Sequence, residues 1–182
     1  MTGALLPLEA LGPRIVILGA SNAGKSTLAS AIARKTGLTP VYLDRLRFEP
    51  HSDWVERPVD EFIAAHDAAI QSERWVSEGN YSFTLPQRFA RATGVIVLWD
   101  RRWPAFYRYV RRTLFERGRL GSIEGDKDSL KWLMIHWILV VQPARRPMYE
   151  TLAADSGLPL VRAFGMKEIN ALYSAWGLER PS

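Results

Sequence analysis

The stretch Gly19 to Ser26 reads GASNAGKS and is followed by Thr27. It fits the pattern G-x-x-x-x-G-K-[ST] at every position. The run RIVILG at 14–19 is short, β-branched and apolar, which predicts a buried strand before the loop. Residues 25–36 carry Leu28 and Ile32 at helical spacing and are followed by Gly37, which predicts a helix after it. A strand, this loop and a helix in that order are the context in which the pattern holds phosphate.

The residue types of the loop explain how it would bind a polyphosphate. Glycine permits backbone conformations that turn successive N–H groups inward, and the following helix N-terminus adds partial positive charge. Lys25 would reach the β- and γ-phosphates, and the Ser26 hydroxyl would coordinate magnesium. The alternative is a glycine-bearing turn with a chance lysine. The candidate nucleotide-binding residues are Gly19, Ser21, Asn22, Ala23, Gly24, Lys25, Ser26 and Thr27.

Strand and helix signals alternate along the rest of the chain. Further strands are expected at 40–44, 74–79, 94–100 and 158–164, and further helices at 58–70, 85–92, 104–117, 130–141 and 166–176. This alternation predicts an α/β fold in which helices cover both faces of a parallel sheet. We expect one domain over residues 1–182, with polar inserts at 45–57 and 118–129.

Composition limits the classes of protein that remain. The chain has 182 residues and no cysteine, which excludes disulfides and thiolate metal sites and fits a cytoplasmic protein. Its first residues, 1–13, contain no lysine or arginine, so they do not resemble a secretory signal. No apolar run approaches the roughly 20 residues of a membrane span, so we expect no membrane association.

Positive charge is concentrated in one segment. Seven of the 19 arginines lie between Arg101 and Arg119, where Glu116 is the only acidic residue. Arg101, Arg108, Arg112 and Arg119 are spaced so that they share one helical stripe, and a glycine-bearing loop follows. Such a helix and loop would serve as a lid that neutralises charge during phosphoryl transfer. The alternatives are a solvated basic face and a nucleic-acid-binding patch.

Carboxylates follow three of the expected strands. Asp44 ends the second strand, Glu78 precedes Gly79-Asn80-Tyr81 at the end of the third, and Asp100 ends the fourth. Ligands of open α/β sheets bind at the carboxyl ends of the strands. We interpret Asp44 as a functional carboxylate, while Asp100 is either a cap for the following helix or a second functional acid.

Four quoted segments carry a resemblance to a known family. They are GASNAGKSTLA at 19–29, YLDRLRF at 42–48, the segment from Trp75 to Tyr81 that ends in GNY, and VIVLWDRRW at 95–103. With the arginine-rich RYVRR at 108–112, the chain resembles the small P-loop kinases related to adenylate and shikimate kinases. Within them it is most similar to the bacterial adenylate kinase-like group known as DNA topology modulation proteins.

The resemblance has definite implications for fold and site. It implies a three-layer P-loop NTPase fold with a five-stranded parallel sheet of order 2-3-1-4-5, ATP with Mg²⁺, and an arginine-rich lid at about 113–130. It places Asp44 and an insert at about 45–73 on the acceptor side, and it matches Arg88 to an arginine that contacts acceptor phosphate. The chain departs from the group at Glu78, where aspartate is usual, and Glu78 would hold magnesium through water.

Two functions from different classes fit these features. The favoured one is a kinase that moves the γ-phosphoryl group of Mg-ATP to a nucleoside, a nucleotide or another hydroxylated metabolite; the alternative is an ATP-dependent regulatory NTPase that binds DNA or protein. The sequence leaves the acceptor open, as well as the choice between monomer and homodimer. The candidate catalytic residues are Lys25, Asp44, Arg108 and Arg112. The candidate acceptor-binding residues are Asp44, Gly79, Asn80, Tyr81 and Arg88.

Overall fold

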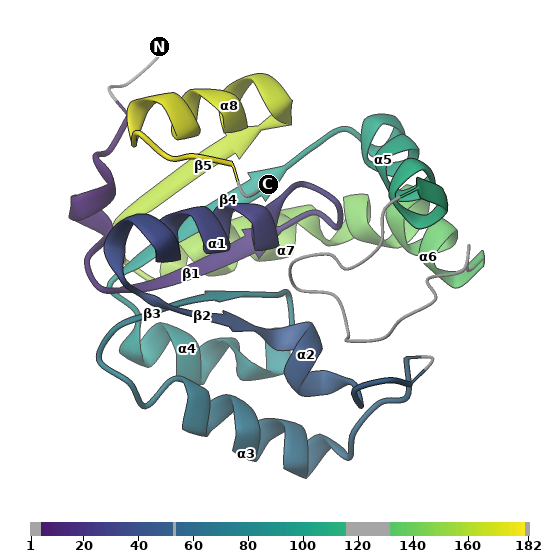
Figure 1. Cartoon of the computed structure of the whole chain (residues 1–182), viewed down its shortest axis with the longest axis horizontal. Helices are drawn as coiled ribbons and strands as arrows, with labels where there is room; N and C mark the ends of the chain where they lie inside the picture. The colour runs from purple at the N-terminus through teal and green to yellow at the C-terminus, as the bar shows by residue number, and fades with distance from the viewer. Residues whose placement is uncertain (1–4, 53, 116–131, 181–182) are drawn as a thin grey trace.

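The computed structural model describes residues 5–52, 54–115 and 132–180 and contains a five-stranded parallel sheet (Figure 1). Its strand order is β2-β3-β1-β4-β5. The predicted α/β class and strand order are therefore confirmed. The strands are β1 (Arg14–Gly19), β2 (Thr39–Tyr42), β3 (Trp75–Glu78), β4 (Gly94–Trp99) and β5 (Leu160–Phe164).

The centre of the sheet is fully apolar because it is covered on both faces. Every residue of β4 is buried, as is every residue of β1 after Arg14. Strand β1 lies between β3 and β4, so that Ile17 is paired with Glu78 on one side and Ile96 on the other. Because these strands are parallel, their carboxyl ends meet at one edge of the sheet.

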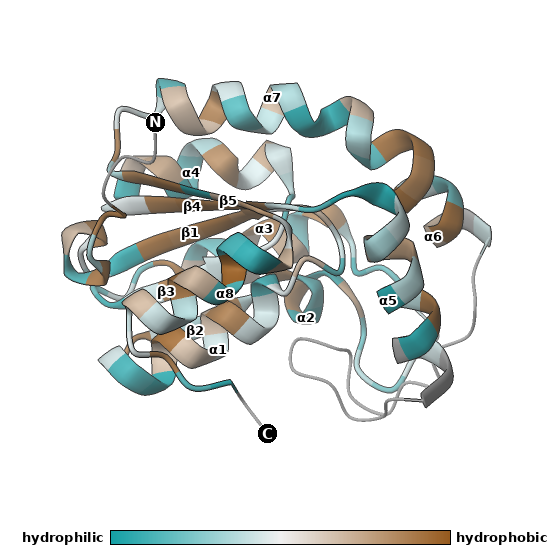
Figure 2. Ribbon diagram, turned by 90° about the horizontal axis from the view of Figure 1, so that it is seen from above, coloured by the Kyte–Doolittle hydropathy of each residue, from teal (hydrophilic) through white to brown (hydrophobic). Residues whose placement is uncertain are grey.

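Helices form the two outer layers. Helices α1 and α8 cover one face of the sheet, and α4 and α7 cover the other (Figure 2). No helix of the described segments has both the length and the apolar character that crossing a membrane requires. The α-helices are α1 (Lys25–Thr36), α2 (Leu43–Arg47), α3 (Val59–Ala69), α4 (Leu85–Arg91), α5 (Arg102–Phe115), α6 (Trp132–His136), α7 (Gln142–Asp155) and α8 (Gly165–Ala175).

The structure differs from the sequence expectations in two places. The second strand ends at Tyr42, so Asp44 lies in the first turn of the short helix α2 rather than at the end of a strand. Of the helix expected at 130–141, residues 132–141 are the first part of a longer helical run, in which α6 passes through a π-helical turn, Trp137–Val141, into α7. The predicted lid at 113–130 lies, from residue 116 onward, outside the described residues.

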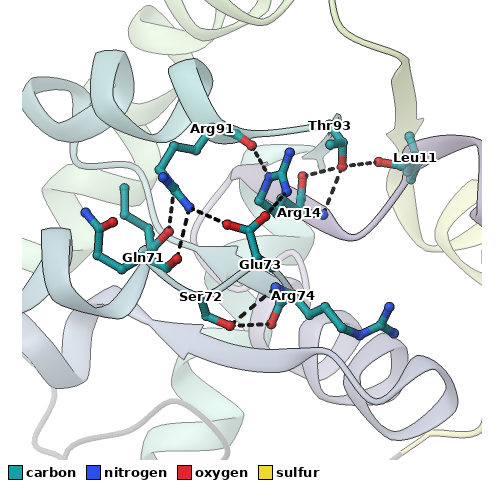
Figure 3. A network of polar contacts seen from close by, with 9 residues as sticks. Leu11, Arg14, Gln71, Ser72, Glu73, Arg74, Arg91 and Thr93 are labelled. Atoms are coloured by element: carbon teal, nitrogen blue, oxygen red, sulfur yellow. Dashed lines mark hydrogen bonds and ion pairs between the residues drawn. The ribbon is translucent and has the colours of Figure 1, made fainter.

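The opposite edge of the sheet is held by a polar network (Figure 3). The carboxylate of Glu73 accepts hydrogen bonds from Arg14 at 2.8 Å and from Arg91 at 3.2 Å. The Thr93 hydroxyl accepts the Arg14 N–H at 2.9 Å and lies 2.8 Å from the carbonyl oxygen of Leu11. These contacts join the amino ends of β1, β3 and β4, which leaves the carboxyl ends of the same strands for a site.

Candidate functional site

The loop between β1 and α1 has the backbone of an anion-binding turn. Three of its residues have positive φ angles, namely Gly19 at 131°, Asn22 at 59° and Gly24 at 90°. Because Gly24 precedes the helix and has no side chain, it caps none of the first N–H groups of α1. The left-handed residues and the N-terminus of α1 thus lie at one point, while the N–H groups of Ala20, Ser21 and Ala23 are engaged by Leu98, Gln142 and Ala20.

Lys25 and Ser26 are the first two residues of α1, directly after the loop. The Lys25 ammonium lies 2.9 Å from the carbonyl oxygen of Ala20, back across the loop. The Ser26 hydroxyl donates a hydrogen bond of 2.9 Å to the carboxylate of Glu78. Glu78 reaches this position because β3 is the parallel neighbour of β1. A lysine, a serine hydroxyl and a carboxylate thus stand together at the start of α1.

The segment Gly79-Asn80-Tyr81 joins Gly19, at the start of the loop between β1 and α1, to Asp44. The side-chain amide of Asn80 donates to the Gly19 carbonyl at 2.6 Å and accepts the Gly19 N–H at 3.0 Å, so it acts as a clamp on the loop. The next residue, Tyr81, donates its hydroxyl to Asp44 at 2.7 Å. The turn at residues 79–81 therefore fixes the position of the Asp44 carboxylate relative to the loop, although Asp44 and the loop belong to different segments of the sequence.

The environment of Tyr81 keeps its hydroxyl protonated. Burial raises the pKa of Tyr81, and the neighbouring Asp44 carboxylate raises it further. Its ring packs against Phe62 and Phe83, with centroids 5.0 Å and 6.1 Å away. Tyr81 is therefore a fixed hydrogen-bond donor that orients the Asp44 carboxylate.

Arg88 lies beneath this segment with no exposed surface. Its guanidinium donates to the carbonyl oxygen of Gly79 at 2.9 Å and to that of Tyr81 at 3.0 Å. Burial lowers the pKa of Arg88. These contacts give Arg88 a role in holding the 79–81 turn, and its predicted contact with acceptor phosphate stays a prediction.

Arg108 connects helix α5 to the phosphate-binding loop. Its Nε atom donates to the carbonyl oxygen of Asn22 at 2.9 Å, and its guanidinium also pairs with the Asp100 carboxylate. Asp100 also accepts the Arg101 N–H at 2.7 Å, one residue before α5 begins, so its role as a helix cap stays a prediction. Arg112 lies on α5, but the structure does not describe its side chain.

Helix α7 contributes two site residues that the sequence did not indicate. Gln142 accepts the Ser21 N–H at 2.6 Å, and the Tyr149 hydroxyl donates to the Asn80 carbonyl oxygen. Ser21 was predicted to bind nucleotide, whereas its N–H is engaged by Gln142. No local pattern marks a glutamine that contacts a residue 121 positions away. The only available signal was the helical run itself, whose continuation past residue 141 went unpredicted.

Glu78 gives the site a pH dependence. Burial raises the pKa of Glu78, and Lys25 opposes this effect by favouring the ionised form. Because the pKa is higher in the folded than in the unfolded protein, this group favours folding at low pH. The advantage is lost as the pH rises from about 4.5, the ordinary value, through the raised one.

Glu78→Gln is therefore expected to stabilise the protein at pH 8, because it removes a buried charge while keeping an acceptor for Ser26. The gain should shrink toward pH 4.5, where the folded carboxyl is more protonated than the unfolded one, of which about half is still ionised. Urea unfolding at the two pH values measures this difference, and the exposed Glu9→Gln is the control for loss of one charge. Equal destabilisation at both values would show that burial does not oppose the Glu78 charge.

Comparison with known proteins identifies the fold. No protein-family model and no curated protein matches the sequence. Among solved structures, a proposed kinase from Chloroflexus aurantiacus has a TM-score of 0.53 at 14% identity, and the match covers 88% of this chain and 94% of that one. A gluconokinase from Sinorhizobium meliloti has a TM-score of 0.51 at 15% identity, with 92% and 93% covered. The chain therefore shares its α/β fold with these two proteins.

Proposed function

We propose that this protein is a kinase that transfers the γ-phosphoryl group of Mg-ATP to a hydroxyl of a small acceptor. One observation carries the proposal. The turn at 79–81 clamps the phosphate-binding loop through Asn80 and orients the Asp44 carboxylate through Tyr81. A nucleotide-binding loop needs no such carboxylate for binding alone, whereas phosphoryl transfer needs an acceptor group placed in line with the γ-phosphate.

The donor side of the site fits a magnesium nucleotide. Ser26 and Glu78 supply a hydroxyl and a carboxylate, the oxygen ligands that Mg²⁺ prefers. The described residues include no cluster of three or more acidic or histidine side chains that would form a metal cage. This suits Mg²⁺, which retains several waters and binds through substrate phosphates. Bound there, the ion would neutralise charge on the β- and γ-phosphates, with Ser26 as its ligand and Glu78 holding a bound water.

The chain's own residues divide the remaining work. Lys25 neutralises charge on the γ-phosphoryl oxygens during transfer, and Arg108 adds positive charge beside the loop. Asp44 orients the acceptor hydroxyl and accepts its proton as the new P–O bond forms and the bond between the γ-phosphorus and the β-phosphate oxygen breaks, which releases ADP. Tyr81 holds Asp44 in place, and Arg112 is a further candidate on α5.

The acceptor class and wider assignment follow from the resemblance. The adenylate kinase-like group suggests a nucleoside or nucleotide acceptor, and the gluconokinase likeness adds hydroxylated sugar acids. In this proposal residues 1–182 form a single cytoplasmic domain, monomeric or homodimeric, with an acceptor-side insert at 45–73 and a lid at 113–130. Arg88 would contact acceptor phosphate only if its present contacts with the 79–81 carbonyl groups opened.

One observation favours the alternative, an ATP-dependent protein that binds DNA. Trp103 and Tyr107 lie one turn apart on α5 and are 62% and 68% exposed, beside the exposed arginines 101 and 102. Aromatic rings among arginines can stack on unpaired bases. Binding of single-stranded DNA that weakens steeply with salt and is lost in the double variant Trp103→Ala/Tyr107→Ala would support this function.

The kinase proposal is tested in two steps. Titration calorimetry with Mg-ATP is expected to show binding, and a screen of nucleosides, nucleotides and sugar acids for ADP formation is expected to find an acceptor. Asp44→Asn should keep nucleotide binding and lose transfer, because it keeps the shape of the side chain but not its proton acceptor. Absence of Mg-ATP binding by folded protein would refute the proposal.

A further inference from the structure

Helix α7 carries two polar side chains toward the nucleotide site. Gln142 and Tyr149 are two helical turns apart and lie on the same side of the helix. Gln142 accepts the N–H of Ser21 at 2.6 Å, and the Tyr149 hydroxyl donates to the Asn80 carbonyl oxygen. Only 4% of Gln142 and 2% of Tyr149 is exposed, so water competes little for either hydrogen bond.

These contacts close a ring around the entrance to the phosphate-binding loop. The Asn80 side chain bonds both polar groups of the Gly19 backbone, and Gly19 lies two residues before Ser21. The ring therefore runs from Gln142 through Ser21 and Gly19 to Asn80, and returns through Tyr149 to the same helix. Loss of either hydrogen bond made by α7, that of Gln142 or that of Tyr149, removes one of the two links between the loop and this helix.

The loop conformation needs support of this kind. Asn22 has a φ angle of 59°, in the left-handed region that is unfavourable for residues other than glycine, although asparagine tolerates it better than most. Its carbonyl oxygen is held by Arg108 of α5. The Ser21 N–H is held from α7 on the adjacent residue. Two helices thus hold adjacent residues, Ser21 and Asn22, of the loop that would cradle the phosphates.

We infer that Gln142 and Tyr149 are positioning residues for the nucleotide, acting through the Ser21 N–H and the Asn80 carbonyl rather than by touching phosphate. The inference rests on the proposed function, because it presumes that the loop binds a nucleoside triphosphate. A preformed loop binds more tightly because the cost of ordering it is met during folding instead of during binding.

Two variants test the inference by calorimetric titration with Mg-ATP. Tyr149→Phe removes one oxygen atom and Gln142→Met removes the acceptor at similar length. Each is expected to weaken Mg-ATP binding about tenfold, the effect of one well-placed hydrogen bond. The double variant should lose little more Mg-ATP affinity than either single variant. Once one of the two hydrogen bonds is absent, the other no longer constrains the loop, so its removal has little further effect on affinity. Loss equal to the product of the single losses would contradict the ring.

Tyr173→Phe is the matched control. Tyr173 is a buried tyrosine of α8 whose hydroxyl has no hydrogen-bond partner among the described residues. Its replacement should leave Mg-ATP affinity unchanged. If Tyr149→Phe and Gln142→Met lower only the melting temperature and bind Mg-ATP like the wild type, α7 is merely a scaffold and the inference is wrong. If the wild type and the control also fail to bind, the proposed function itself falls, which is a different result.

Discussion

Lys25→Ala is expected to reduce phosphoryl transfer by about 10³-fold or more, since it removes a preorganised positive charge from the transferring group. The ammonium group lies 2.9 Å from the Ala20 carbonyl oxygen, on the inner side of the loop. Its position at the first residue of α1 adds it to the positive end of the helix dipole. No other lysine of the described residues lies within this loop.

The measurement is the rate of ADP formation with the acceptor found by the screen. Lys35→Ala is the control, because Lys35 lies on the same helix but at its other end, where its ammonium lies 3.3 Å from the Gly177 carbonyl oxygen. Lys35→Ala should keep wild-type turnover. Phosphotransfer retained by folded Lys25→Ala would count decisively against the kinase proposal.

The central part of the fold could be predicted from the sequence because its signals are local. The run RIVILG and the helix from Lys25 to Thr36 were placed with the bounds that the structure has. Gly37 ends the helix in the left-handed conformation that glycine adopts without strain. Continuous apolar strands, as in GVIVLW at 94–99, indicated burial on both faces.

Helix α7 was not predicted from the sequence, because its local signals conflict. Pro143 and Pro147 suggest breaks, yet Pro143 directly follows the π-helical turn Trp137–Val141 and the helical run continues through both prolines. Pro147 is tolerated inside the helix because tertiary packing, including that of the buried Tyr149, outweighs local propensity. The positions of Gln142 and Tyr149 at the site followed only from the assembled fold.

The role of Asn80 shows a similar limit. The sequence marked it as an acceptor-binding candidate because GNY follows a strand at the ligand-binding edge. In the structure both polar groups of its amide contact Gly19, while Tyr81 next to it bonds Asp44. A motif locates the site, whereas the division between residues that touch substrate and residues that position others depends on contacts between distant segments.

Gly19→Ala is expected to destabilise the protein by several kcal/mol, on the order of 3 kcal/mol or more, and to abolish nucleotide binding. A Cβ atom at this position would lie 1.8 Å from the backbone carbonyl oxygen of Leu98, which pairs with Gly19 across the sheet. The φ angle of 131° is also unfavourable for alanine. Neither β1 nor β4 can yield easily, because both are buried at the centre of the sheet.

Gly37→Ala separates the two causes. Gly37 also has a positive φ angle, 72°, but a Cβ atom there would meet nothing within 4 Å. Its replacement should cost only about 1 kcal/mol, the price of the backbone conformation alone. Urea unfolding of both variants measures the difference. If Gly19→Ala unfolds at the same urea concentration as Gly37→Ala and still binds Mg-ATP, the close approach of β1 and β4 does not require glycine, and the loop is less rigidly placed than its contacts with Leu98 and Asn80 imply.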